Sequence, residues 1–136
     1  MVGFTSCPDI CPTTLTVLKA VRQRLGDSAN RPRFLLISVD PQRDRPDRLD
    51  TYVKFFDPAF IAATGRITEL DKLARSLGFT YERIEGASPG SYTMDHSSSL
   101  ILIDPQARLA GYFRPPFQVH PIANRLRNVL GPLPEG

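Results

Sequence analysis

Residues 7–18 read CPDICPTTLTVL, a short loop with two cysteines that leads directly into a run with helical spacing. Cys7 and Cys11 are the only cysteines of the chain and lie close together whatever the rest of the fold is. Two thiols at a helix start can work as a dithiol/disulfide pair or hold a soft metal ion, and the positive end of the helix favours the thiolate. Asp9, between them, is expected to cap the helix. The plainer alternative is a structural pair, but a disulfide across so short a loop adds little stability.

The pattern beyond this stretch predicts alternating helices and strands. Apolar residues recur at helical spacing over residues 14–25, and the continuous apolar run over residues 33–40 is typical of a buried strand. The same criteria predict further helices over residues 46–56, 68–77 and 118–130, strands over residues 60–63, 79–84 and 98–103, and a second hairpin arm over residues 109–113. Residues 85–93 contain glycine, proline and polar side chains, so a mobile loop is expected there.

This alternation favours an α/β fold with a mostly parallel sheet, helices on both faces and a C-terminal antiparallel hairpin. In such sheets, binding sites gather at the carboxyl ends of the strands. The cysteine loop belongs at that edge, and so does Asp40, which ends the apolar run.

Length and composition are those of one globular domain, which we expect to cover residues 1–136. The net charge is +3, and the basic residues are scattered rather than interleaved with aromatic ones, so nucleic-acid binding is not expected. A mildly basic face can still dock an acidic protein partner. The longest apolar runs are much shorter than the roughly 20 residues of a membrane-spanning helix.

A third candidate for the cysteine site is His96, in the segment DHSS at residues 95–98. A neutral imidazole could complete a site with two sulfurs and one nitrogen, and this donor set suits copper in either oxidation state. Structural zinc would want a fourth protein ligand. A single histidine is more often an ordinary surface or core residue, and His120 is interpreted as structural. Asp40 is either a turn residue before Pro41 or a supporting carboxylate near the thiols.

Three blocks together resemble the Sco/SenC family of copper chaperones, in order and in spacing. They are GFTSCPDICPTTL at residues 3–15, SVDPQRD at residues 38–44 and DHSS at residues 95–98. The resemblance extends over nearly the whole chain. It implies a thioredoxin-like fold, copper as Cu(I) or Cu(II) bound by Cys7, Cys11 and His96, and a supporting role for Asp40.

The resemblance also implies a biological role, because the family serves assembly of the dinuclear copper centre of cytochrome c oxidase. The implied partners are the copper-receiving subunit of the oxidase and other copper chaperones. Family members are usually tethered to the bacterial inner membrane, facing the periplasm, or to the mitochondrial inner membrane. Relative to that pattern, the membrane anchor, a leading hairpin and most of a central strand are absent before Gly3, so we expect a domain truncated at its N-terminus. The location that we expect is the periplasmic side of the bacterial inner membrane.

Three functions stay open on these residues. A metallochaperone would hold copper, with the segment 85–96 opening and closing the site. A thiol–disulfide oxidoreductase would use Cys7 as nucleophile and Cys11 to resolve the mixed disulfide, so the sequence leaves open whether the protein is an enzyme. A peroxiredoxin-like peroxidase is the weakest alternative. That pattern places Thr or Ser three residues before the cysteine and Pro seven before it, where this chain has Pro8 and Phe4.

Overall fold

The computed structural model describes residues 1–8, 10–26 and 32–131. Within these ranges the elements follow in the order β1 (Val2–Gly3), α1 (Ile10–Leu25), β2 (Leu35–Ser38), α2 (Pro46–Phe56), β3 (Ile61–Ala63), α3 (Ile67–Leu77), β4 (Tyr81–Glu85), β5 (Tyr92–His96), β6 (Leu100–Ile103), β7 (Leu109–Phe113) and α4 (Val119–Leu130). Three parallel strands form the main sheet in the order β1-β2-β3, while β4–β5 and β6–β7 are antiparallel hairpins. The predicted α/β fold is confirmed. Asp9, which we expected to cap α1, lies outside the described residues.

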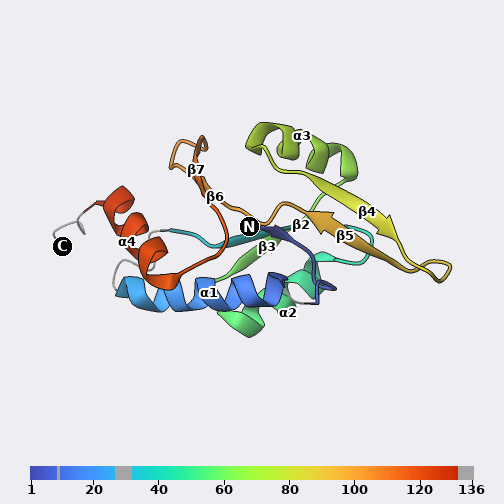
Figure 1. Cartoon of the computed structure of the whole chain (residues 1–136), viewed down its shortest axis with the longest axis horizontal. Coiled ribbons are helices and arrows are strands. Elements are labelled where there is room, and N and C mark those ends of the chain that lie inside the picture. The colour runs from blue at the N-terminus through green and yellow to red at the C-terminus, as the bar shows by residue number, and fades with distance from the viewer. Residues whose placement is uncertain (9, 27–31, 132–136) are drawn as a thin grey trace.

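Helices cover both faces of the main sheet, as predicted. In Figure 1, α1 and α2 lie below the strands and α3 lies above them. The larger core cluster joins α1, α2 and α4 to β2. On the other face, α3 packs through its apolar side against a smaller cluster formed by Val2, Val39 and Phe79. None of the described helices has the length and apolar character needed to cross a membrane.

The helix α1 begins earlier than the apolar spacing predicts, at Ile10 rather than at residue 14. Pro12 permits this start, because the first four N–H groups of a helix have no partner within it. Cys11 therefore lies in the first helical turn. Further along, the buried face includes Leu15 and Leu18, and burial of each such side chain contributes roughly 1.5–3 kcal/mol. This anchoring fixes the end of the helix that carries the thiol.

The predicted loop over residues 85–93 is wrong in its extent. The strand β5 already begins at Tyr92 and pairs with β4, with Tyr81 opposite His96 and Glu85 opposite Tyr92. Only residues 86–91 connect the two strands. The strand alternates half-buried and exposed residues, but it has only five residues and directly follows a turn that contains glycine and proline, so in the sequence the loop signal outweighs this short alternation. Half of the expected gate over residues 85–96 is therefore paired strand, and His96 lies on a strand.

Candidate metal centre

The cysteine loop lies at the carboxyl end of the parallel sheet, where the sequence predicts it. Gly3 of β1 is paired with Ser38 of β2, so the loop after β1 and the loop after β2 leave the sheet together. The N–H of Cys7 donates to the Phe4 carbonyl at 3.2 Å, which forms a turn. The N–H of Cys11 then donates to Cys7 Sγ at 3.4 Å. These bonds fold the loop so that both sulfurs lie on the same side of the helix start.

The structure brings together the three residues that the sequence singles out. One potential ligand atom each from Cys7, Cys11 and His96 lies within 4.8 Å of the other two. Cys11 Sγ lies 3.7 Å from His96 Nε2. The Cys7 residue is 8% exposed and the Cys11 residue is fully buried. The cluster is therefore a compact set of two sulfurs and one nitrogen, with Cys7 as its more accessible thiol.

The imidazole is held so that Nε2 is directed toward the sulfurs. His96 Nδ1 lies 2.9 Å from the Ser97 carbonyl, which can only accept, so Nδ1 carries the proton. This tautomer leaves the Nε2 lone pair available to a metal. The ring of Phe4 packs edge-on against the imidazole, with centroids 5.8 Å apart. A backbone carbonyl and an aromatic ring thus orient the candidate ligand before any ion binds.

Gly3 is a residue of the site whose role the sequence does not reveal. A Cβ atom at this position would lie 2.6 Å from Cys11 Sγ and 3.2 Å from Leu36 Cδ1. The backbone of β1 can therefore approach the thiol this closely only without a side chain. The requirement is steric and tertiary, since it comes from a sulfur eight residues further along the chain.

The thiol of Cys11 is harder to ionise than its place in the helix suggests. Burial raises its pKa to about 12, and the hydrogen bond with Cys7 and the negative charge of Asp44 act in the same direction. A hydrogen bond with the Phe4 backbone opposes them in part. The expectation that the helix start favours the thiolate is therefore wrong for Cys11, because desolvation outweighs the helix field. In the metal-free protein this residue is a neutral thiol at physiological pH.

Asp40 is buried at the end of β2, but its described partners are not the thiols. Its carboxylate accepts from Tyr92 Oη at 2.7 Å and from Arg43 Nε at 2.5 Å. The Arg43 guanidinium lies 3.8 Å from the centre of the Tyr92 ring and 6.0 Å from that of Phe4. Asp40 thus connects to His96 indirectly, through Arg43 and Phe4, and its supporting role toward a metal stays a prediction.

Asp44 is a second buried carboxylate near the site, and the sequence reasoning did not assign it a role there. It is fully buried and accepts hydrogen bonds from the Thr5 N–H at 2.9 Å, the Thr5 hydroxyl at 2.5 Å and the Ser38 hydroxyl at 2.6 Å. These bonds tie the cysteine loop to β2. Asp44 is the last residue of the segment VDPQRD, which also contains Asp40. This shared segment was the sequence signal that could have marked Asp44 as a residue near the site.

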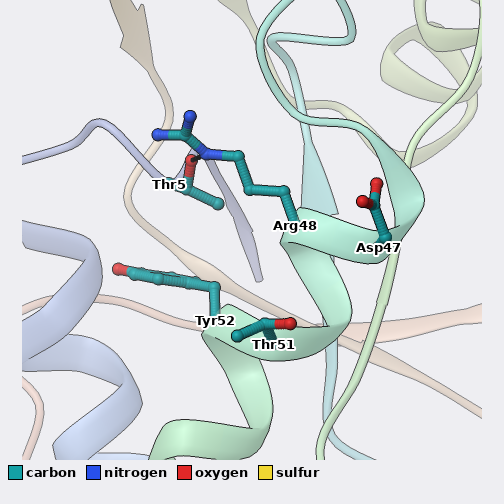
Figure 2. Close-up of a pocket in the computed structure, with 5 residues that line it drawn as sticks. All are labelled: Thr5, Asp47, Arg48, Thr51 and Tyr52. Atoms are coloured by element: carbon teal, nitrogen blue, oxygen red, sulfur yellow. Dashed lines mark hydrogen bonds between the residues drawn. The ribbon is translucent and has the colours of Figure 1, made fainter.

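An open hollow of about 390 Å³ adjoins the cysteine loop on the side of α2. Figure 2 shows Arg48 reaching from α2 to Thr5, with the ring of Tyr52 below it in this view. The Tyr52 hydroxyl is buried without a hydrogen-bond partner among the described residues, and burial raises its pKa to about 12. Thr5, which lines the hollow, is two residues from Cys7 in the sequence.

Comparison with known proteins gives consistent likenesses over nearly the full chain. The sequence profile of the SCO1/SenC family matches residues 1–131. An SCO2-like protein of Rickettsia typhi is 35% identical over 127 residues, which is 93% of this chain and 63% of the relative. The chain therefore spans less than two thirds of that relative's length.

Two solved structures, both with copper bound, share the fold. The ScoI structure of Bradyrhizobium japonicum has a TM-score of 0.84 at 31% identity, and the alignment covers 93% of this chain and 80% of the other. The ScoI structure of Arabidopsis thaliana has a TM-score of 0.86 at 31% identity and covers 95% and 80%. The thioredoxin-like fold that the sequence resemblance implies is confirmed by these two likenesses.

Proposed function

Because the chain belongs to the SCO1/SenC family, we propose that it is a copper metallochaperone that carries copper on Cys7, Cys11 and His96. The observation that carries this proposal is the convergence of two thiol sulfurs and an oriented imidazole nitrogen within 4.8 Å. Thiolates are soft ligands that favour Cu(I), and imidazole suits both copper oxidation states. Both structural relatives hold copper, which supports the same choice of metal.

The donor set argues against a structural zinc site. Structural zinc is held by four protein ligands in a tetrahedron, usually cysteine and histidine. In the part of the chain that the structure describes, the cluster contains three candidate ligands of these types, and no further aspartate or glutamate joins it. Three ligands suit a cargo ion, which must bind firmly and still be accessible to the thiols of an acceptor.

The biological role that we propose is delivery of copper to the dinuclear centre of cytochrome c oxidase, or maturation of that centre. The partners would be the copper-receiving subunit of the oxidase and other copper chaperones. The location would be the periplasmic side of the bacterial inner membrane. Support for the role, partners and location comes from the three sequence blocks of the resemblance.

A thiol–disulfide oxidoreductase is the second candidate, favoured by the unequal exposure of the thiols. Cys7 is partly accessible and Cys11 is fully buried, the arrangement expected of an attacking and a resolving cysteine. The Cys7 thiolate would attack a partner disulfide and release one partner thiol. Cys11 would then displace the second thiol and leave a Cys7–Cys11 disulfide. His96 has no required part in this exchange, and that difference separates the two functions.

The test is an anaerobic Cu(I) titration of the reduced protein against a competing chelator. We expect one equivalent of tightly bound copper, no tight binding in Cys7→Ser, and affinity lowered by at least about tenfold in His96→Ala. The control is His120→Ala, which removes the other histidine from an exposed position in α4 and should bind copper normally. Dithiol exchange should survive in His96→Ala. Copper affinity indifferent to His96 would contradict the chaperone and favour the oxidoreductase.

A further inference from the structure

All of the sulfur in this chain gathers at one place. The sequence has two cysteines and two methionines. Both methionines, Met1 and Met94, pack against the buried cluster formed by Phe4, Cys7 and Cys11. Methionine is uncommon in this protein, and a thioether is chemically distinct from the aliphatic and aromatic side chains that fill the rest of the core. These two residues are therefore candidates for a chemical role at the site in addition to their packing role.

Met94 lies on the same strand and the same face as His96. In β5, Tyr92, Met94 and His96 are half-buried, whereas Thr93 and Asp95 are exposed. Residues two apart in a strand point to the same side, so the thioether packs against the cluster of Phe4, Cys7 and Cys11 from the same face of β5 that carries the imidazole. The pairing of β4 with β5 fixes this register.

Met1 is the less suitable of the two thioethers. Its side chain also packs against the large core cluster, and its ammonium donates to the Leu35 carbonyl at 2.7 Å. Met94 instead lies between the cysteine cluster and the small cluster under α3, two residues from the imidazole that we assign to copper. Only Met94 is thus carried on the same strand as a candidate ligand.

We propose that Met94 is a further copper ligand, whose thioether joins Cys7, Cys11 and His96 around Cu(I) and biases the site toward that oxidation state. This inference rests on the proposed copper-carrying function. A thioether is soft and neutral, so it favours Cu(I) over Cu(II) and binds without releasing a proton. It adds a bond to the metal without adding negative charge to a buried site that already contains two thiols.

The direct test replaces sulfur by selenium. In protein produced with selenomethionine, selenium occupies positions 1 and 94 only, and absorption at the selenium edge of the Cu(I)-loaded protein reports its neighbours. We expect copper among the neighbours of selenium, and no such signal in Met94→Leu, where Met1 carries the only selenium. Copper bound through sulfur and nitrogen with no copper near selenium would overturn the inference and leave the proposed function intact. Absence of bound copper would overturn both.

A second measurement separates ligation from packing. Met94→Leu nearly conserves side-chain volume, so the core should be retained and the urea midpoint should change little. We expect about tenfold weaker Cu(I) affinity and unchanged Cu(II) affinity. A tenfold loss of affinity for Cu(I) alone corresponds to a Cu(II)/Cu(I) potential that is lower by about 59 mV in Met94→Leu than in the parent protein. Equal Cu(I) affinity and an equal potential in the two proteins would make Met94 a core residue only.

Discussion

Substitution of Gly3 by alanine is the sharpest test of how the site is built. The new Cβ atom would lie 2.6 Å from Cys11 Sγ and 3.2 Å from Leu36 Cδ1, so it is wedged between a thiol and a core side chain. Ordinary carbon contacts lie at about 3.5–4.0 Å, so the sulfur must move by about 1 Å. Such overpacking costs about 1–3 kcal/mol, and the lower entropy of the unfolded chain returns about 0.4–1 kcal/mol. We expect a net loss in the free energy of unfolding, of up to about 2.6 kcal/mol.

The same displacement should weaken copper binding, because Cys11 Sγ would leave its place 3.7 Å from His96 Nε2. We expect Cu(I) affinity to fall by about tenfold or more. The assays are urea unfolding of the reduced apoprotein and competition for Cu(I). The matched control is Gly111→Ala, also in a strand, where a Cβ meets nothing within 4 Å and stability should be equal or slightly higher. Indistinguishable behaviour of the two variants would refute the steric argument.

Three further predictions concern Asp44, Tyr92 and Cys11. Asp44→Asn should lower the free energy of unfolding by about 1.5–3 kcal/mol, because three donors lose a charged acceptor; an unchanged urea midpoint would contradict this. Tyr92→Phe should lower the free energy of unfolding by about 1 kcal/mol, because it loses only the hydrogen bond to Asp40. Tyr92→Leu should lower it by about 1 kcal/mol more, because it also loses two stacked guanidinium groups. Equal urea midpoints in the two variants would count against the stacking. The folded state raises the pKa of Cys11 from 9.0 to about 12, so this thiol's contribution to stability is complete below pH 9 and is lost as the pH rises toward 12. Between pH 8 and pH 10.5, the free energy of unfolding of the reduced apoprotein, measured in urea, should fall more steeply with pH than that of Cys11→Ala. Parallel pH profiles of the two proteins would show that Cys11 does not titrate in this way.

The fold was predictable where a segment is apolar or keeps a regular period. The buried run that becomes β2 and the amphipathic pattern of α1 are signals of that kind. The strand β1 has only two residues and exists through its pairing with β2, so no local pattern could predict it. The strand β5 was not predicted because it has only five residues and a turn rich in small residues directly precedes it. Pairing with β4, a tertiary effect, decides its conformation.

The candidate site was predictable in its composition but not in its electrostatics. The spacing of Cys7 and Cys11 already places two thiols together, while His96 became a strong candidate only through the family resemblance. Gly3 and Asp44 depend on contacts between the cysteine loop and the rest of the fold, which the sequence does not display. The sequence places Cys11 at a helix start, where local fields favour the thiolate, and only the folded chain shows that the residue is fully buried.

That burial determines how the protein can give copper away. A buried thiol with a raised pKa ionises only when a cation takes the place of its proton, so copper and protons compete for Cys11. Below the pKa, each unit of pH changes the apparent affinity by about tenfold for this one proton. An acceptor whose thiols are already ionised at neutral pH does not face that competition and can draw the metal away. The direction of transfer should therefore follow the difference in thiol pKa between donor and acceptor. If the final distribution of copper between this protein and acceptors of matched geometry were independent of acceptor thiol pKa, this control by burial would be excluded.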